Sequence, residues 1–308
     1  MIEILLQTMP FFGLIALGWG AGVTGFFSEE ATGYITKFVF YFALSAMIFR
    51  FAANLSFGDV FNLTSIAAYL GATLVVYLLV TVVALMRGCS VSEAAVEAQC
   101  GSIGNIGFLG IPMLALLMGE AAVGTIMIML AVDLIVFGSL LVVLITGSGR
   151  GGLTPSVLKP VVMGLLKNPM VVSMALGLFC SGWAVPIPDT VNQFLAILGA
   201  AATPCALFAI GASLASKSAE RVSVAGWLSF AKLVLHPAMV AVAVYFVFDV
   251  DPYVASVLVA ASALPVAGNI YIVARHYQVA PSRVSAAILF STLCSILTVS
   301  WVIARVQV

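Results

Sequence analysis

Apolar stretches long enough to cross a lipid bilayer follow one another along almost the whole chain of 308 residues. A membrane-spanning helix needs about 20 predominantly apolar residues. Ten such stretches can be placed: 4–24, 32–53, 60–86, 91–117, 120–146, 167–184, 191–215, 222–248, 252–275 and 282–305. The sequence therefore predicts an all-α polytopic membrane protein with ten transmembrane helices.

The composition supports this class and argues against several others. Hydrophobic residues make up 63% of the chain and charged residues 8%, whereas a soluble domain carries about 25% charged residues. The net charge is zero, and no basic patch predicts a nucleic-acid partner. The N-terminus lacks a basic segment and a small-residue cleavage site, so we expect a first span and not a signal peptide. No cysteine pair has metal-ligand spacing, so neither a metal nor a cofactor is expected.

Two of the spans contain residues that interrupt helices. The stretch 101–112 in the fourth span carries four glycines, an asparagine and a proline, and the stretch 264–270 in the ninth carries a proline, a glycine and an asparagine. Glycine and proline weaken helices. Broken backbone survives in lipid only where protein or a water-filled cavity satisfies its polar groups.

The sequence Gly-Asn-Ile occurs in both interruptions, at 104–106 and 268–270. Paired interruptions in corresponding places of two halves indicate the binding site of a transporter. We therefore expect helices four and nine to be broken and to cross at a polar site. The residues expected at this site are Gly104, Asn105, Pro112, Pro265, Gly268 and Asn269.

A polar segment from 147 to 168 divides the chain into two halves, 1–150 and 151–308, with five spans each. Most basic residues fall in the odd-numbered loops between spans, which predicts that these loops are cytoplasmic and that both termini lie outside the cytoplasm. Because five spans reverse the direction of the chain, the second half would enter the membrane in the opposite orientation. The two halves are thus predicted to be inverted five-helix repeats.

Four ionisable side chains lie within predicted spans, where a charge costs about 2.5 kcal/mol or more. Asp133 is expected to be a coupling residue or a fixed partner for a helix break or a base. Lys232 and His236 are one helical turn apart and share a face. They are expected to hold an anion; alternatively, Lys232 reaches the interface or pairs with an acid, and His236 packs through hydrogen bonds. Glu97 is a coupling residue or a solvated glutamate at the cytoplasmic end.

Asn105 and Asn269 each follow a glycine at an interruption. An amide offers two donors and one acceptor, so it can bind a substrate or satisfy loose backbone. If the breaks cross, the N-termini of the half-helices point their positive ends at one place, which favours an anion such as a carboxylate. In the tenth span, Ser291, Ser295 and Thr298 share one face and are expected to allow close packing.

The segment 104–112, Gly-Asn-Ile-Gly-Phe-Leu-Gly-Ile-Pro, resembles the fourth-helix signature of the auxin efflux carrier family, the bacterial relatives of the plant auxin exporters. The segments 37–44, 206–214, 232–237 and 265–275 resemble the same family in the same order, so the resemblance covers essentially the whole chain. Two positions depart from the family: Ser45 stands where proline is frequent, and Gly268 stands where bulkier residues are common.

The resemblance implies the fold of the bile-acid sodium symporters, with ten helices in two inverted repeats. It implies a scaffold of helices one, two, six and seven, and a transport domain of helices three to five and eight to ten. Substrates would be small organic anions such as auxin-like acids, malonate or malate. The transport domain would move against the scaffold to alternate access, and a homodimer through the scaffold is expected.

The sequence thus predicts a multi-pass secondary transporter of a small organic anion in the cell (inner) membrane, with a proton carried by Asp133. The alternative is a sodium-coupled symporter in which oxygens of Ser102, Asn105, Asn269 and Glu97 hold the ion. A membrane sensor that binds a ligand without moving it is a further alternative. An enzyme is disfavoured because His236 and His276 lie on different helices without a catalytic cluster.

Overall fold

The computed structural model describes residues 2–54, 62–148, 158–215 and 222–306, and these residues are predominantly helical. Several helices are continued by π-helical turns, which carry the label η. In chain order the elements are α1 (Ile2–Val23), α2 (Glu29–Phe38), η1 (Val39–Ala43), α3 (Leu44–Asn54), α5 (Leu63–Met86), α6 (Val91–Ser102), η2 (Ile106–Gly110), α7 (Ile111–Met118), α8 (Ala122–Ala131), η3 (Val132–Phe137), α9 (Gly138–Ser148), α10 (Leu158–Lys167), α11 (Pro169–Gly182), α12 (Asp189–Ala200), α13 (Ala202–Ala215), α14 (Val222–Phe230), η5 (Ala231–Leu235), α15 (His236–Val242), η6 (Ala243–Val247), α16 (Pro252–Ser262), α17 (Asn269–Tyr277) and α18 (Pro281–Val306).

Helical segments coincide with the predicted spans. Within the described residues, seven uninterrupted helical stretches are long and apolar enough to cross a membrane. The pair α10 and α11 passes the same test only as one unit, with a bend of 71° between its two helices. The predicted fourth and ninth spans do not contain a helix long enough to cross a membrane, because each is broken in its middle. An α-helical multi-pass membrane protein is therefore confirmed, while the arrangement of ten spans as inverted repeats stays a prediction.

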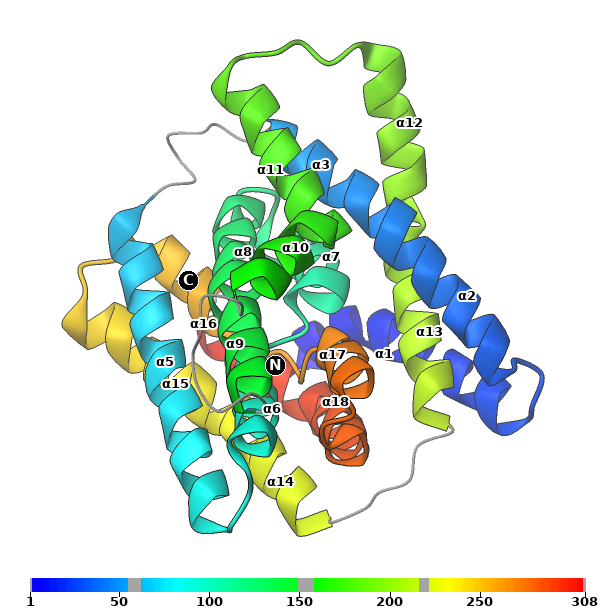
Figure 1. Cartoon of the computed structure of the whole chain (residues 1–308). Coiled ribbons are helices and arrows are strands. Elements are labelled where there is room, and N and C mark those ends of the chain that lie inside the picture. The colour runs from blue at the N-terminus through cyan, green and yellow to red at the C-terminus, as the bar shows by residue number, and fades with distance from the viewer. Residues whose placement is uncertain (1, 55–61, 149–157, 216–221, 307–308) are drawn as a thin grey trace.

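The helices form two groups that lie side by side (Figure 1). In the first group α1 packs along α13, and α3 packs on α11 and α12. A Cβ atom on Gly18 would lie 2.0 Å from the Phe208 carbonyl oxygen, and one on Gly211 would lie 1.9 Å from that of Ile15. Because only glycine permits this approach of two backbones, α1 and α13 are fixed against each other.

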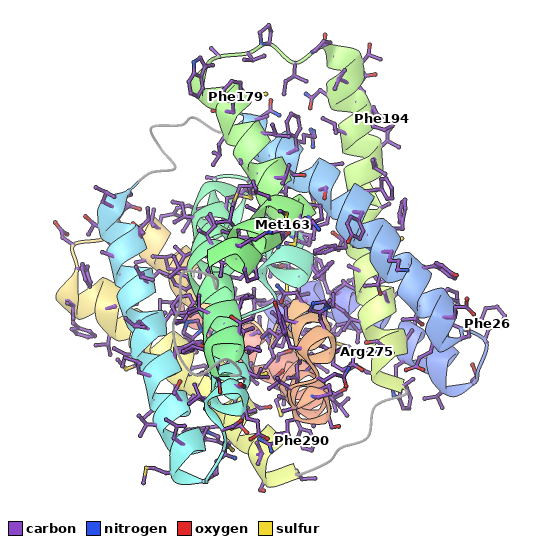
Figure 2. All side chains as sticks on the ribbon, in the orientation of Figure 1. Phe26, Met163, Phe179, Phe194, Arg275 and Phe290 are labelled. Atoms are coloured by element: carbon purple, nitrogen blue, oxygen red, sulfur yellow. The ribbon has the colours of Figure 1, made fainter. Side chains whose placement is uncertain are left out.

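The second group contains the remaining long helices, with α5 against α6 and α16, α14 against α18, and α15 against α5. Side chains on the outer surface of the molecule are largely apolar (Figure 2). Phe26, Phe179 and Phe194, for example, are 86%, 50% and 62% exposed. Large apolar surface of this kind is stable only in contact with lipid or with another apolar surface.

The segment 147–168 that divides the two halves is partly helical. Residues 149–157, which include Arg150, lie outside the described residues, but residues 158–167 form the helix α10. The helix ends at Lys167 because Asn168 takes an extended conformation before Pro169, the first residue of α11. Met163 of α10 is exposed (Figure 2).

Candidate binding site

The two helix breaks lie against each other. The first break separates α6 from η2, and the second separates α16 from α17. Asn105 donates its backbone N–H to the carbonyl of Pro265 at 2.8 Å, and Ala267 donates to the carbonyl of Ile103 at 3.2 Å. Gly104 and Val266 thus form a short antiparallel bridge. Each break satisfies backbone groups that the other would leave unpaired inside the protein.

Side chains from two other helices satisfy further groups at the second break. Val266 donates its N–H to Ser291 Oγ of α18 at 3.1 Å. Lys232 Nζ of η5 donates to the carbonyl of Ser262, the last residue of α16. The sequence assigns Ser291 a packing role only, whereas the structure gives it a hydrogen bond that supports the break.

Lys232 is fully buried and does not reach the membrane interface, so that alternative is wrong. Its Nζ atom lies 3.0 Å from His236 Nδ1, and His236 Nε2 lies 3.0 Å from Thr73 Oγ1. An ammonium group has donors only, so His236 accepts at Nδ1 and donates from Nε2 to Thr73. A Cβ atom on Gly104 would lie 3.3 Å from Lys232 Nζ. The ammonium group is therefore packed directly against the crossing, and glycine leaves room for it.

Asp133 lies in η3 and is 3% exposed. Its Oδ1 atom accepts a hydrogen bond of 2.7 Å from the Tyr69 hydroxyl, and its Oδ2 atom has no partner in the part of the chain that the structure describes. Tyr69 and Thr73 are one turn apart on α5, and the rings of Tyr69 and His236 are 5.9 Å apart. The helix α5 therefore contacts Asp133 through Tyr69, and through Thr73 it contacts His236, which is bonded to Lys232.

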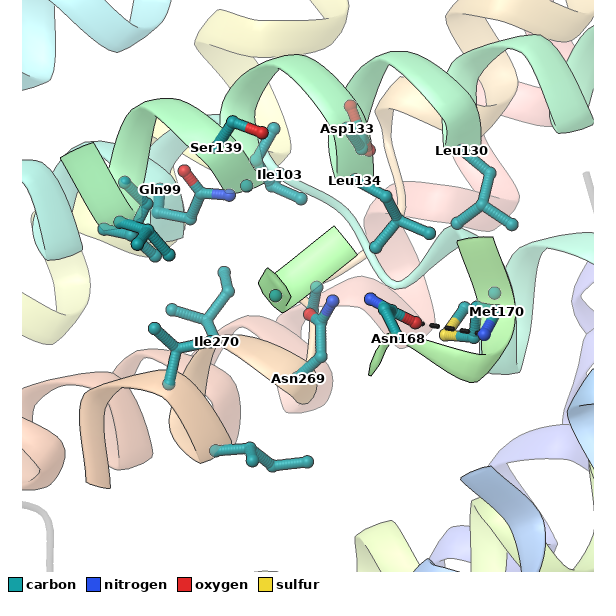
Figure 3. Close-up of a pocket in the computed structure, with 18 of the residues that line it drawn as sticks. Gln99, Ile103, Leu130, Asp133, Leu134, Ser139, Asn168, Met170, Asn269 and Ile270 are labelled. Carbon is teal, nitrogen blue, oxygen red and sulfur yellow. Dashed lines mark hydrogen bonds between the residues drawn. The ribbon is translucent and has the colours of Figure 1, made fainter. Parts of the chain in front are cut away.

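A cavity of about 370 Å³ opens beside the crossing (Figure 3). This volume is within the usual range for small-molecule sites, about 300–1,000 Å³. Helices of both groups contribute to its wall. Its polar side chains come from Gln99, Asn105, Asp133, Ser139, Asn168, Asn269 and His276, and the rest of the wall is mostly apolar.

Several residues that line the cavity have a buried polar atom without a partner among the described residues. These atoms are Gln99 Oε1, Asp133 Oδ2 and Asn269 Oδ1. Asn105 makes no capping bond to η2, and Asn269 is the first residue of α17 and has an Oδ1 atom without a partner among the described residues. Since backbone groups of the two breaks pair with each other, these two amides are not needed to hold the crossing.

The structure brings together some of the predicted site residues and separates others. Gly104, Asn105, Asn269 and Asp133 line this cavity. Residues that are not on its wall are Pro112, Pro265, Gly268, Lys232, His236 and Glu97. Pro265 contributes its carbonyl to the crossing, and Pro112 lies in the first turn of α7.

Glu97 is neither solvated nor at the cavity. It is 1% exposed and forms ion pairs with Arg87 and, at 3.0 Å, with Arg283. Arg283 also pairs with Glu93 at 2.7 Å. The expectation of a solvated glutamate is wrong because Arg283, far away in the sequence, packs against the start of α6. These ion pairs connect α6 with the start of α18.

Five side chains of the site are absent from the sequence-based set: Tyr69, Gln99, Ser139, Asn168 and His276. Tyr69, Gln99 and Ser139 carry no local signal, because each is one polar residue in a predicted membrane helix. Asn168 does carry one, since asparagine followed by proline is typical of a helix start.

Comparison with known proteins agrees with this architecture. The family described as "Membrane transport protein" matches residues 4–303. A protein of Rhizobium meliloti (strain 1021) described as "Putative malonate transporter" is 30% identical over 306 residues, which cover 97% of this chain and 95% of that protein. The family match confirms the resemblance of residues 104–112 to the auxin efflux carriers. The chain therefore belongs to the membrane transport protein family that includes the auxin efflux carriers, and it is a transporter and not an enzyme.

Proposed function

We propose that this protein is a secondary transporter that moves a small carboxylate across the cell (inner) membrane by alternating access. The observation that carries the proposal is the pair of amides, Asn105 and Asn269, at the starts of two half-helices beside one cavity. Backbone pairing at the crossing leaves both amides available to a ligand.

The electrostatics of the crossing favour an anion at the cavity. The helical segments that begin at Ile106 and Asn269 direct their positive N-terminal ends toward it. The negative C-terminal end of α16 is bound by Lys232 instead. A carboxylate at Asn105 and Asn269 would therefore meet donors and partial positive charge.

The relative described as a malonate transporter supports a small dicarboxylate as the substrate class. Malonate is compact and polar at both ends, and a cavity of about 370 Å³ accommodates it. Auxin-like acids and malate remain alternatives within the same class of organic anions.

Asp133 supports coupling to protons. Asp133 lines the same cavity and its Oδ2 atom has no partner among the described residues; an ionised carboxylate there would repel an anionic substrate. A proton on Asp133 removes this repulsion, so substrate and proton would bind together. Sodium coupling is the alternative, but Glu97 is engaged by two arginines and Ser102 Oγ donates to the carbonyl of Ala98. The sodium ligands expected from the sequence are thus partly engaged elsewhere.

The two groups of helices support the division into scaffold and transport domain. We propose that α1, α2–α3, α11 and α12–α13 are the scaffold and that the other long helices move against it. The cavity has walls from α11 and from α6, η3 and α17, so it lies where such a motion would open and close it. We further propose ten spans in two inverted repeats (1–150 and 151–308), termini outside the cytoplasm, and a homodimer through the scaffold.

Counterflow in proteoliposomes tests the function. Vesicles loaded with unlabelled malonate should accumulate radiolabelled malonate, and an imposed pH gradient without sodium should drive net uptake. Uptake that requires sodium would replace protons with sodium in the mechanism. Binding without any counterflow would instead favour a membrane sensor.

Replacing Asn105 or Asn269 with alanine is expected to weaken malonate binding about tenfold in each case, because each change removes a hydrogen bond to a charged ligand. Isothermal titration calorimetry on the purified variants measures the effect. Asn192→Ala is the control, since Asn192 bonds Arg50 on the scaffold at 3.2 Å and is not on the cavity wall. Unchanged affinity in both cavity variants would exclude these amides from the site.

A further inference from the structure

Asn168 holds a fixed orientation at the corner between α10 and α11. Its Oδ1 atom accepts a hydrogen bond of 3.0 Å from the backbone N–H of Met170, which caps the start of α11. Because a backbone N–H can only donate, the amide oxygen must lie on that side. The Nδ2 group consequently points away from α11, into the cavity and toward Asn269 (Figure 3).

No acceptor for the Nδ2 hydrogens of Asn168 is found among the described residues. The group lies beside the N-terminal end of α11, a helix of 14 residues whose partial positive charge favours an anion. The cavity thus has donors on a second side, contributed by the scaffold group and not by the crossing.

Buried groups on the same wall indicate independently that the cavity binds a ligand. Gln99 is 4% exposed and Asp133 is 3% exposed; both residues line the cavity, and each has a side-chain oxygen without a partner among the described residues. Buried polar atoms are rarely left unpaired in a stable protein unless a ligand or water satisfies them. The unpaired polar groups around this cavity therefore favour a bound ligand or ordered water there.

We propose that Asn168 binds the second carboxylate of a dicarboxylate whose first carboxylate lies at Asn105 and Asn269. This inference rests on the proposed transport of carboxylates and adds a specificity-determining residue to it. A monocarboxylate would fill one side of the cavity and leave the Asn168 donors unpaired, so it would bind more weakly. A dicarboxylate would also bridge the crossing and the start of α11, which lie on different groups of helices.

Asn168→Asp separates ligand binding from helix capping. Aspartate keeps an oxygen that accepts from Met170 and is an equally good N-cap, but it loses the amide donors and adds a negative charge. We expect an unchanged melting temperature, a loss of malonate affinity of about tenfold or more, and a clearly smaller loss for propionate, whose single carboxylate lies on the other side of the cavity and meets the added charge only from a distance. Asn168→Ala should lose malonate affinity and also lower the melting temperature, because the cap is lost.

The matched control is Asn62→Asp, the same exchange at the N-cap of α5, where Asn62 accepts from Ser65 N–H at 3.1 Å and is not on the cavity wall. It should change neither malonate nor propionate binding. Calorimetric titration with both acids at neutral pH gives the four affinities. Retained malonate affinity in Asn168→Asp, or equal losses for both acids, would overturn the inference alone. Wild-type protein that binds neither acid would overturn the proposed function as well.

Discussion

Asp133→Asn is expected to abolish net malonate uptake driven by a pH gradient while malonate counterflow continues. Asparagine has nearly the same shape and keeps an oxygen that can accept from the Tyr69 hydroxyl, now bonded to Asp133 at 2.7 Å. It cannot gain or lose a proton, however, and its uncharged amide resembles a permanently protonated carboxyl group. The variant should therefore bind substrate and exchange it. The substrate-free carrier, however, has to release the proton from residue 133 before it can return across the membrane, and asparagine cannot do this.

Net uptake and counterflow are measured on the same proteoliposomes, with the melting temperature as a test of folding. The control is Asp189→Asn, which removes an exposed carboxylate at the start of α12, away from the cavity. Wild-type uptake in Asp133→Asn would remove this residue from the coupling mechanism. Loss of counterflow together with uptake would mean that Asp133 is needed for substrate movement itself, and proton coupling through it would be excluded.

The positions of the helix breaks could be predicted from the sequence because the signal is local. Residues such as Gly104, Asn105, Pro265 and Gly268 are poor helix formers, and they stand out in apolar spans. Which backbone groups pair across the crossing could not be predicted, since the register depends on how two distant segments pack. The bond from Asn105 to Pro265 is the result of that packing.

Charged side chains were harder to assign from sequence because their partners are remote. Arg283 lies 186 positions from Glu97, and the carbonyl that Lys232 binds lies 30 positions away on α16. An acid or base within a span indicates that some partner exists, but it does not identify that partner. Asn168 was missed for a related reason: its capping signal is local, whereas its place on the cavity wall depends on the bend between α10 and α11.

Lys232→Met is expected to destabilise the protein and disrupt the crossing. Methionine fills a similar volume but has no donor, so the Ser262 carbonyl and His236 Nδ1 would both lose the hydrogen bond from Lys232 inside the protein. Each unsatisfied buried acceptor costs about 1–3 kcal/mol, which corresponds to a fall in melting temperature of about 5 °C or more. Because Lys232 packs against Gly104, malonate binding at the adjacent Asn105 should weaken too.

Thermal unfolding in detergent, with and without malonate, measures both effects. The control is Lys159→Met, which removes a lysine on the exposed side of α10 and should leave the melting temperature unchanged. Lys232→Arg distinguishes the effect of the positive charge from that of side-chain size, since it keeps the charge but places a larger guanidinium group against Gly104. If the role of Lys232 were only to supply positive charge for the substrate, Lys232→Met would keep its melting temperature and lose malonate binding. A loss of both, with little recovery in Lys232→Arg, is the result expected for a residue that holds the two breaks together.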